Sequence, residues 1–322
     1  MLSKYFIMLL LLSIAFIACH QSTETHKTEV HGSLRLVSET SAGSVPYGVS
    51  ADSVYAYITN NDGLLIFDIH EPDRPKQIGK VRLGVTLGVT IRYEHAFTVG
   101  EGGLSIIDIN DPQHPQKLGE VQCQGEGHSI CVQDSLAYIA GSAGLEIINI
   151  STPANPNKVG HFSNGRDAWG VAFIDSIVYL ADRHHGLEII DVTNPADPQE
   201  ITTVPGTQSA WNVHHYQDYL FLGRHRYGSE IYHLQDKRNP QRIGSYCDDD
   251  GGEALSVWGD NKHLLVADNF NIELLDITNP ASPREIGQVE GVKGAHDIFV
   301  KGNYIFIAEA MKGLIILEYN PE

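Results

Sequence analysis

The residues of this chain that could do chemistry are basic and imidazole side chains gathered in two short stretches. The stretch "RHH" contains Arg183, His184 and His185, and the later stretch "RHR" contains Arg224, His225 and Arg226. Guanidinium and imidazole groups held together favour an anionic ligand or an acidic partner. We therefore treat all six as candidate ligand-binding residues.

Two tryptophans precede these stretches. Trp169 and Trp211 stand shortly before "RHH" and "RHR". Flat aromatic surfaces beside polar groups are typical of sites for small molecules and sugars. We therefore add both tryptophans to the candidate ligand-binding residues. The alternative is that such large rings only fill the centre of the fold.

A different chemistry would use a histidine as a general base. His128 and His296 are the candidates, and Asp297 directly follows His296. An imidazole near a carboxylate can accept a proton close to neutral pH. However, the chain has no G-x-S-x-G motif, no H-E-x-x-H motif and no sialidase-type Asp box. A non-catalytic binding protein is therefore our first interpretation, and a lyase or hydrolase using one of these histidines is the alternative.

No metal site and no cofactor are predicted. A site built from His185, His225 and a channel histidine is not required by any sequence spacing. The acidic loop "CDDDGGE", residues 247–253, has oxygen ligands for calcium but lacks the EF-hand pattern, which favours a solvated loop.

These candidates are positioned by a repeated unit. The stretch "GLEIIDVTNPADP" begins at Gly186, and related stretches begin at Gly63, Gly103, Gly144, Gly228, Asn271 and Gly313. Successive starts are 40 to 43 residues apart, a period typical of four-stranded propeller blades. In the fourth unit we expect strands over 169–175, 176–182, 186–192 and 199–204. Paired prolines belong in the turn before the fourth strand, because proline cannot donate to a strand ladder.

The two ends of the array predict a closed ring. The last unit stops after its third strand, "GLIILEY", and "GSLRLVSE" at residues 32–39 resembles an isolated fourth strand. Pairing the two would complete a seventh blade and remove open sheet edges. The predicted fold is therefore all-β: a seven-bladed β-propeller of four-stranded antiparallel blades over residues 32–322, closed by an N-terminal strand that completes the last blade.

Alternating strand directions gather two sets of loops on one face, which we call the top face. These are the loops that enter each inner strand and the hairpins that join the second and third strands. The basic stretches fall in these hairpins, and the candidate tryptophans and histidines open inner strands at the mouth of the central channel. An acidic residue such as Asp68 or Asp191 ends the third strand of most units. Because it recurs, we expect it to accept backbone N–H groups rather than to form a site.

The repeat core, "LEIID" or "LSIID" followed by "TNP" and a later "IG", resembles the LVIVD repeat of bacterial and archaeal envelope proteins. The resemblance covers residues 31–322. It implies a β-propeller on an exported protein, and it brings no agreed catalytic residues.

The N-terminus predicts export. The apolar run that ends at Cys19 is typical of a signal peptide, which we place at residues 1–18. Its end, "FIAC", resembles the lipobox of bacterial lipoproteins, in which the cysteine is acylated and becomes the N-terminus. Residues 19–31 would then be a flexible tether behind a lipidated Cys19. We expect a membrane-anchored lipoprotein, in the outer membrane if the cell has one, since His20 replaces the aspartate of inner-membrane retention; simple secretion is the alternative.

Charge and cysteine content limit the partners. Residues 1–18 contain one charged residue, Lys4, so the net charge of −18 becomes −19 after cleavage. This charge repels phosphate backbones, which argues against nucleic acid. We expect an envelope protein, a glycan or a small anion as partner. Cys123, Cys131 and Cys247 are interpreted as buried apolar residues, with one disulfide as the alternative.

Overall fold

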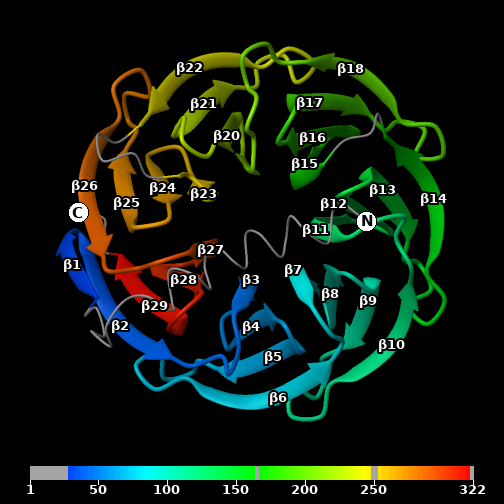
Figure 1. The fold of residues 1–322 in the computed structure, drawn as a ribbon, viewed down its shortest axis with the longest axis horizontal. Coiled ribbons are helices and arrows are strands. Elements are labelled where there is room, and N and C mark those ends of the chain that lie inside the picture. The colour runs from blue at the N-terminus through cyan, green and yellow to red at the C-terminus, as the bar shows by residue number, and fades with distance from the viewer. Residues whose placement is uncertain (1–27, 164–166, 248–252, 320–322) are drawn as a thin grey trace, which may run out of the picture.

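The computed structural model describes residues 28–163, 167–247 and 253–319, which form seven β-sheets arranged in a ring (Figure 1). Each sheet is one blade, and its first strand lies near the centre while its last strand lies at the rim. Neighbouring strands are antiparallel within every blade. The predicted all-β, seven-bladed propeller is therefore confirmed.

The strands occupy four equivalent positions in the blades. The first strands are β3 (Pro46–Ala51), β7 (Thr86–Arg92), β11 (Gly127–Gln133), β15 (Ala168–Ile174), β19 (Asn212–Tyr216), β23 (Ser256–Gly259) and β27 (Ala295–Lys301). The second strands are β4 (Tyr55–Asn60), β8 (His95–Gly100), β12 (Leu136–Gly141), β16 (Ile177–Asp182), β20 (Tyr219–Gly223), β24 (His263–Ala267) and β28 (Tyr304–Glu309). The third strands are β5 (Gly63–Asp68), β9 (Gly103–Asp108), β13 (Gly144–Asn149), β17 (Gly186–Asp191), β21 (Ser229–His233), β25 (Asn271–Asp276) and β29 (Gly313–Tyr319). The fourth strands are β6 (Lys76–Arg82), β10 (Gln116–Val121), β14 (Asn157–Phe162), β18 (Gln199–Thr203), β22 (Gln241–Tyr246), β26 (Arg284–Glu290) and, for blade seven, β2 (Leu34–Thr40).

The N-terminal strand β2 closes the ring. It pairs with β29, with Leu34 opposite Tyr319 and Thr40 opposite Leu314. Blade seven is thus built from both ends of the propeller, as the orphan fourth strand in the sequence predicts. This pairing covers the edge that β29 would otherwise expose.

One strand was not expected. β1 (Glu29–Gly32) pairs with β26 and adds a fifth strand to blade six, with Glu29 opposite Glu290. Residues 29–31, expected in the tether, are therefore part of a sheet. The proposed signal peptide and Cys19 lie outside the described residues. None of the described residues forms a helix that could cross a lipid bilayer.

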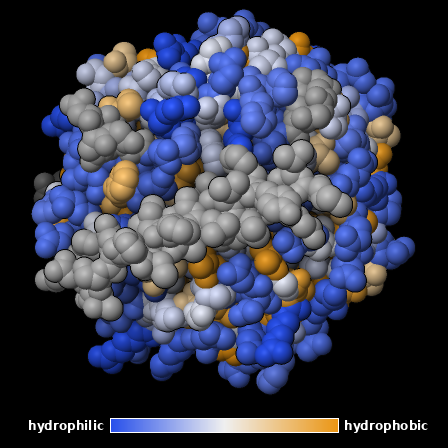
Figure 2. Space-filling model, viewed as in Figure 1, coloured by the Kyte–Doolittle hydropathy of each residue, from blue (hydrophilic) through white to orange (hydrophobic). Residues whose placement is uncertain are grey.

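The core lies between the blades. One cluster joins Tyr179 and Ile189 of blade four to Leu222 and Tyr232 of blade five, and all four are almost fully buried. This explains why the third strands are nearly continuous in apolar residues, since both faces of a blade are covered. Of the described residues visible in Figure 2, most are hydrophilic and the apolar ones are scattered.

The recurring acidic residue after the third strand has a structural role. Asp68 Oδ1 accepts the N–H of His70, and Asp191 Oδ1 accepts that of Thr193, both at 2.9 Å. Hydrogen bonds from Thr193 and then from Arg238 lower the pKa of Asp191 to about 2. The prediction that this acid holds the following turn is confirmed.

Candidate ligand-binding site at the channel mouth

Four rings from three consecutive blades form a continuous row at the top of the inner strands, a region that we call the channel mouth. His128 stacks on Trp169 with ring centroids 4.1 Å apart, and Trp169 lies 4.6 Å from Trp211. Trp211 in turn stacks on His225 at 5.1 Å. We call these four residues the ring row. Each of the two tryptophans thus has a neighbouring ring on both sides.

Backbone contacts across the blade boundaries hold the ring row. His128 Nδ1 donates to the carbonyl of Ala168, the residue before Trp169, at 2.8 Å. His225 exchanges two backbone hydrogen bonds of 3.0 Å with Ala254 of blade six, and it adopts a left-handed φ of 50°. Such a conformation is uncommon for a residue other than glycine and persists where the surroundings fix it. These contacts fix the orientation of the His128 ring and the position of the His225 backbone.

Arg183 lies over the ring row. Its guanidinium carbon is 5.8 Å from the ring centroid of Trp169 and 5.2 Å from that of Trp211, distances at which a cation is attracted to an indole. Its Nη1 is 3.5 Å from Oδ2 of Asp167. The sequence-predicted Arg183, Trp169 and Trp211 are thus brought together.

His225 is paired with an acid that sequence reasoning missed. Its Nε2 is 3.0 Å from Glu253 Oε2, and the Asn269 amide donates to the same carboxylate. Burial lowers the pKa of His225, and the neighbouring Glu253 opposes this effect. Glu253 lies in a loop that enters an inner strand, as do Asp167 and Glu126, and that position could have identified all three.

His184, His185 and Arg226 lie at the surface of the top-face hairpins. The backbone N–H groups of His184 and His185 both donate to Oδ1 of the buried Asp182, each at 2.7 Å. His185 Nδ1 is 3.1 Å from the same oxygen. These hairpins therefore offer basic groups to solvent from a fixed backbone.

Arg224 is different from the other basic candidates. Its Nη1 donates to Glu230 Oε1 at 2.7 Å and its Nη2 to the Gln208 carbonyl at 3.1 Å. Glu230 is buried on β21 and also binds Arg242 and Tyr232. Arg224 therefore neutralises the buried Glu230 carboxylate. This structural role accounts for the arginine even if it binds no ligand.

His296 repeats the geometry of His128 in another blade. Its Nδ1 donates to the Pro46 carbonyl at 2.7 Å, and its ring stacks on Tyr47 with centroids 5.3 Å apart. Pro46 precedes Tyr47 just as Ala168 precedes Trp169. Burial lowers the pKa of His296. The recurrence identifies this contact as a way of joining neighbouring blades.

Asp297 points to other partners. Its Oδ2 accepts the N–H of Val49 at 3.0 Å, and its Oδ1 accepts the Ser256 hydroxyl at 3.3 Å. Burial raises the pKa of Asp297 to about 7. Among the described residues, no hydrogen bond or ion pair joins Asp297 to His296, so the carboxylate does not orient that imidazole. The structure therefore does not assemble the histidine–aspartate pair that the enzyme hypothesis needs.

Potential metal ligands do not gather at this site. His185 and His225 have the separate partners given above. Within the described ranges, the grouping with suitable ligand atoms is Glu29, His31 and Glu290, whose atoms lie within 4.8 Å of one another. All three are exposed and sit on β1 and β26, away from the channel mouth. The acidic loop at 247–253 lies mostly outside the described residues.

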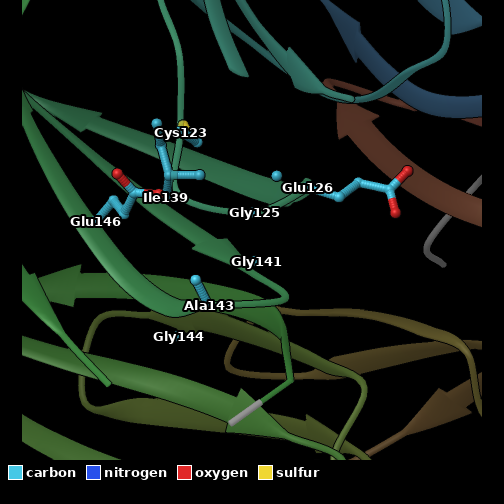
Figure 3. Close-up of a pocket in the computed structure, with 9 residues that line it drawn as sticks. Cys123, Gly125, Glu126, Ile139, Gly141, Ala143, Gly144 and Glu146 are labelled. Carbon is cyan, nitrogen blue, oxygen red and sulfur yellow. The ribbon is translucent and has the colours of Figure 1, made fainter. Parts of the chain in front are cut away.

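A small pocket in blade three contains a thiol and an acid (Figure 3). Its lining includes Cys123 and Glu146, while the Glu126 carboxylate points away from both (Figure 3). Burial and then the charge of Glu146 raise the pKa of the Cys123 thiol to about 12. Such a thiol stays protonated and is a poor nucleophile. Cys123 and Cys131 form no disulfide, and Cys247 is exposed, so the expectation that it is buried is wrong.

Comparison with known structures supports the fold. The β-propeller domain of Cps50 (Swd1) from Myceliophteria thermophila superposes with a TM-score of 0.73 at 9% identity, over 89% of this chain and 100% of that one. The computationally designed Ika8 protein superposes with a TM-score of 0.63 at 11% identity, over 88% and 99%. At such identities the likeness concerns the fold alone. No protein of curated function matches the sequence.

A family model for the LVIVD repeat matches six segments of the chain: 47–82, 86–122, 124–163, 165–205, 251–290 and 294–318. The unmatched interval contains blade five, in which Lys237 replaces the first proline of the turn. The matched segments cover more than half of the chain. This protein therefore belongs to the LVIVD-repeat family of β-propellers.

Proposed function

We propose that this protein is a non-catalytic binding propeller of the cell envelope, which recognises an anionic glycan or another negatively charged partner through its top face. The ligand would contact the exposed groups of blades four and five, chiefly His184, His185 and Arg226. Lipid attachment at Cys19 would hold the propeller at a membrane.

The ring row carries this proposal. Four rings and Arg183 pack against one another across three blades, so the basic hairpins of blades four and five stand on a packed support. Binding groups fixed before the ligand arrives lose less entropy on binding. Cationic side chains on such a support suit carboxylate, sulfate or phosphate groups.

The two candidate general bases fit this proposal better than catalysis. His128 is nearly buried, and both His128 and His296 donate Nδ1–H to a backbone carbonyl of the next blade. The remaining Nε2 of His128 could accept a proton, but it lies 3.9 Å from the Glu126 carboxylate rather than in an open cleft. A lyase or hydrolase would need substrate to displace this packing.

A thermal-shift screen of the mature chain tests the proposal. Acidic envelope glycans, neutral glycans and small anions are added separately, and a ligand of the folded state raises the melting temperature. We expect acidic glycans to give the largest shift. The shift should shrink in Arg226→Ala and persist in Arg74→Ala, an exposed arginine of a proline turn on the opposite face. Equal shifts in both variants would place the ligand elsewhere.

A further inference from the structure

The hairpins of the top face differ between the two halves of the ring. Blades five, six and seven each expose one large apolar side chain at the hairpin tip: Tyr227 (51% exposed), Phe270 (52%) and Met311 (68%). The tips of the other four blades carry small or polar residues, namely Asn61–Asp62, Glu101–Gly102, Ser142–Ala143 and Arg183–His185. We call Tyr227, Phe270 and Met311 the apolar tips. Three neighbouring blades thus share an unusual surface property.

Basic residues flank two of the three apolar tips, Tyr227 and Met311. The guanidinium carbons of Arg224 and Arg226 lie 5.1 and 5.7 Å from the ring centroid of Tyr227. Lys312 follows Met311 directly, and its ammonium is 3.2 Å from Glu39. Apolar side chains flanked by long basic ones are typical of surfaces that lie in a lipid interface.

The chain enters the propeller at the same edge. Glu29 pairs with Glu290, at the end of β26 where the chain turns into the next inner strand, so β1 begins at the top face. Thr28 is buried there, and its hydroxyl contacts both Lys312 and Glu39. The described part of the chain therefore begins at the top face, between blades six and seven and near Met311.

The length of the chain before Thr28 limits where a lipid anchor can be. Nine residue steps separate Cys19 from Thr28, which span about 30 Å at full extension. A lipid on Cys19 would therefore keep the bilayer close to the apolar tips. Attachment through a short tether makes a second contact effectively intramolecular, so even a weakly apolar surface is occupied.

We propose that the apolar tips dock on the bilayer that holds the lipid anchor, with the disc tilted mainly onto blades six and seven and with Tyr227 and Arg226 of blade five at the edge of the contact. This inference rests on the lipid attachment included in the proposed function. The driving force is burial of apolar side chains rather than attraction to anionic lipid, because the mature chain carries a net charge of −19. The hairpins of blades one to four then face away from the membrane, and the ring row lies between the two regions.

Depth-dependent quenching tests this orientation. The full chain is produced with its own leader, purified from membranes and reconstituted in phosphatidylcholine vesicles with or without bromine on the acyl chains. Phe270→Trp and Met311→Trp report the apolar tips. Tyr93→Trp, at an exposed turn on the opposite face, and Asp62→Trp, at a polar tip of blade one, are the controls. The parent chain supplies the background emission of its three tryptophans.

We expect bromine to lower the added emission in Phe270→Trp and Met311→Trp and to leave both controls unchanged. Equal quenching in Asp62→Trp, or none at the apolar tips, overturns the docking. A chain that does not stay with the vesicles overturns both the anchor and the docking. Neither result bears on the proposed ligand site. That site is tested separately, by the loss of the ligand-induced shift in melting temperature in Arg226→Ala.

Discussion

Gly160 of blade three lies against the carbonyl of Pro195 in blade four, so closely that a Cβ atom on Gly160 would come within 1.9 Å of that oxygen. The same contact joins further pairs in successive blades: Gly79 with Pro112, Gly119 with Pro153, and Gly244 with Pro280. The glycine of the fourth strand and the first proline of the next turn are therefore two sides of one contact between blades.

Replacing this glycine should destabilise the ring. In Gly160→Ala the added methyl group must displace backbone, and overpacking of this kind costs about 1–3 kcal/mol. Gly102→Ala is the matched control, because nothing lies within 4 Å of its Cβ position. Urea unfolding of both variants measures the difference. Similar unfolding free energies would contradict the proposed contact.

Blades four and five replace this contact with another. Thr202 stands in place of the glycine and Lys237 in place of the proline, and the Tyr179 hydroxyl donates to the Lys237 carbonyl at 2.7 Å. We expect Tyr179→Phe to lower the unfolding free energy by about 1 kcal/mol. Asp175→Asn, which removes the exposed ion pair with Lys237, should cost less. Chemical denaturation compares them, and the reverse order would show that the ion pair dominates.

Loss of the closing strand β2 should destabilise the propeller more than loss of the additional strand β1. A chain beginning at Ser33 lacks only β1, whereas a chain beginning at Ser41 also lacks β2 and exposes the edge of β29. We expect the shorter chain to melt at a lower temperature and to self-associate, because an open strand edge pairs with other chains. Calorimetry and analytical ultracentrifugation measure both properties. Equal behaviour of the two truncations would mean that β2 does not close the ring.

The buried Asp297 predicts a pH dependence. Its pKa is raised from 3.8 to about 7 by burial, so the folded state binds a proton that the unfolded state has released between these values. Stability from this group is therefore complete below pH 4 and declines as the pH rises towards 7. Asp297→Asn should remove this decline. Unfolding of both proteins from pH 4 to 8 tests it, and parallel curves would exclude Asp297 as the source.

The repeat made most of the fold predictable. The spacing from Gly63 to Gly313 and the orphan strand at residues 32–39 predict seven blades and their closure, because each unit needs neighbours to bury both faces. β1 could not be predicted, since residues 29–32 resemble no strand of the repeat. Their pairing depends on a free edge of β26 that exists only in the folded ring.

The repeat predicts where the residues of the candidate site lie, but it does not predict which groups they contact. The repeat places Trp169 and Trp211 at inner strands, and the ring row follows from that placement. The roles of Arg224 and His128 could not be foreseen, because Glu230 and the Ala168 carbonyl are brought to them only by folding. A side chain that breaks the repeat can therefore serve either a ligand or a neighbouring blade.

Tryptophan emission during a titration with acidic glycan fragments tests the central claim most directly. Trp169 and Trp211 lie in the ring row, whereas the third tryptophan, Trp258, packs against His214 with ring centroids 5.5 Å apart. We expect a saturable change in emission that disappears in the Trp169→Phe/Trp211→Phe double variant and weakens in Arg226→Ala, while Arg74→Ala behaves like the parent. No saturable change, or one that survives in the double variant, would contradict binding at the channel mouth.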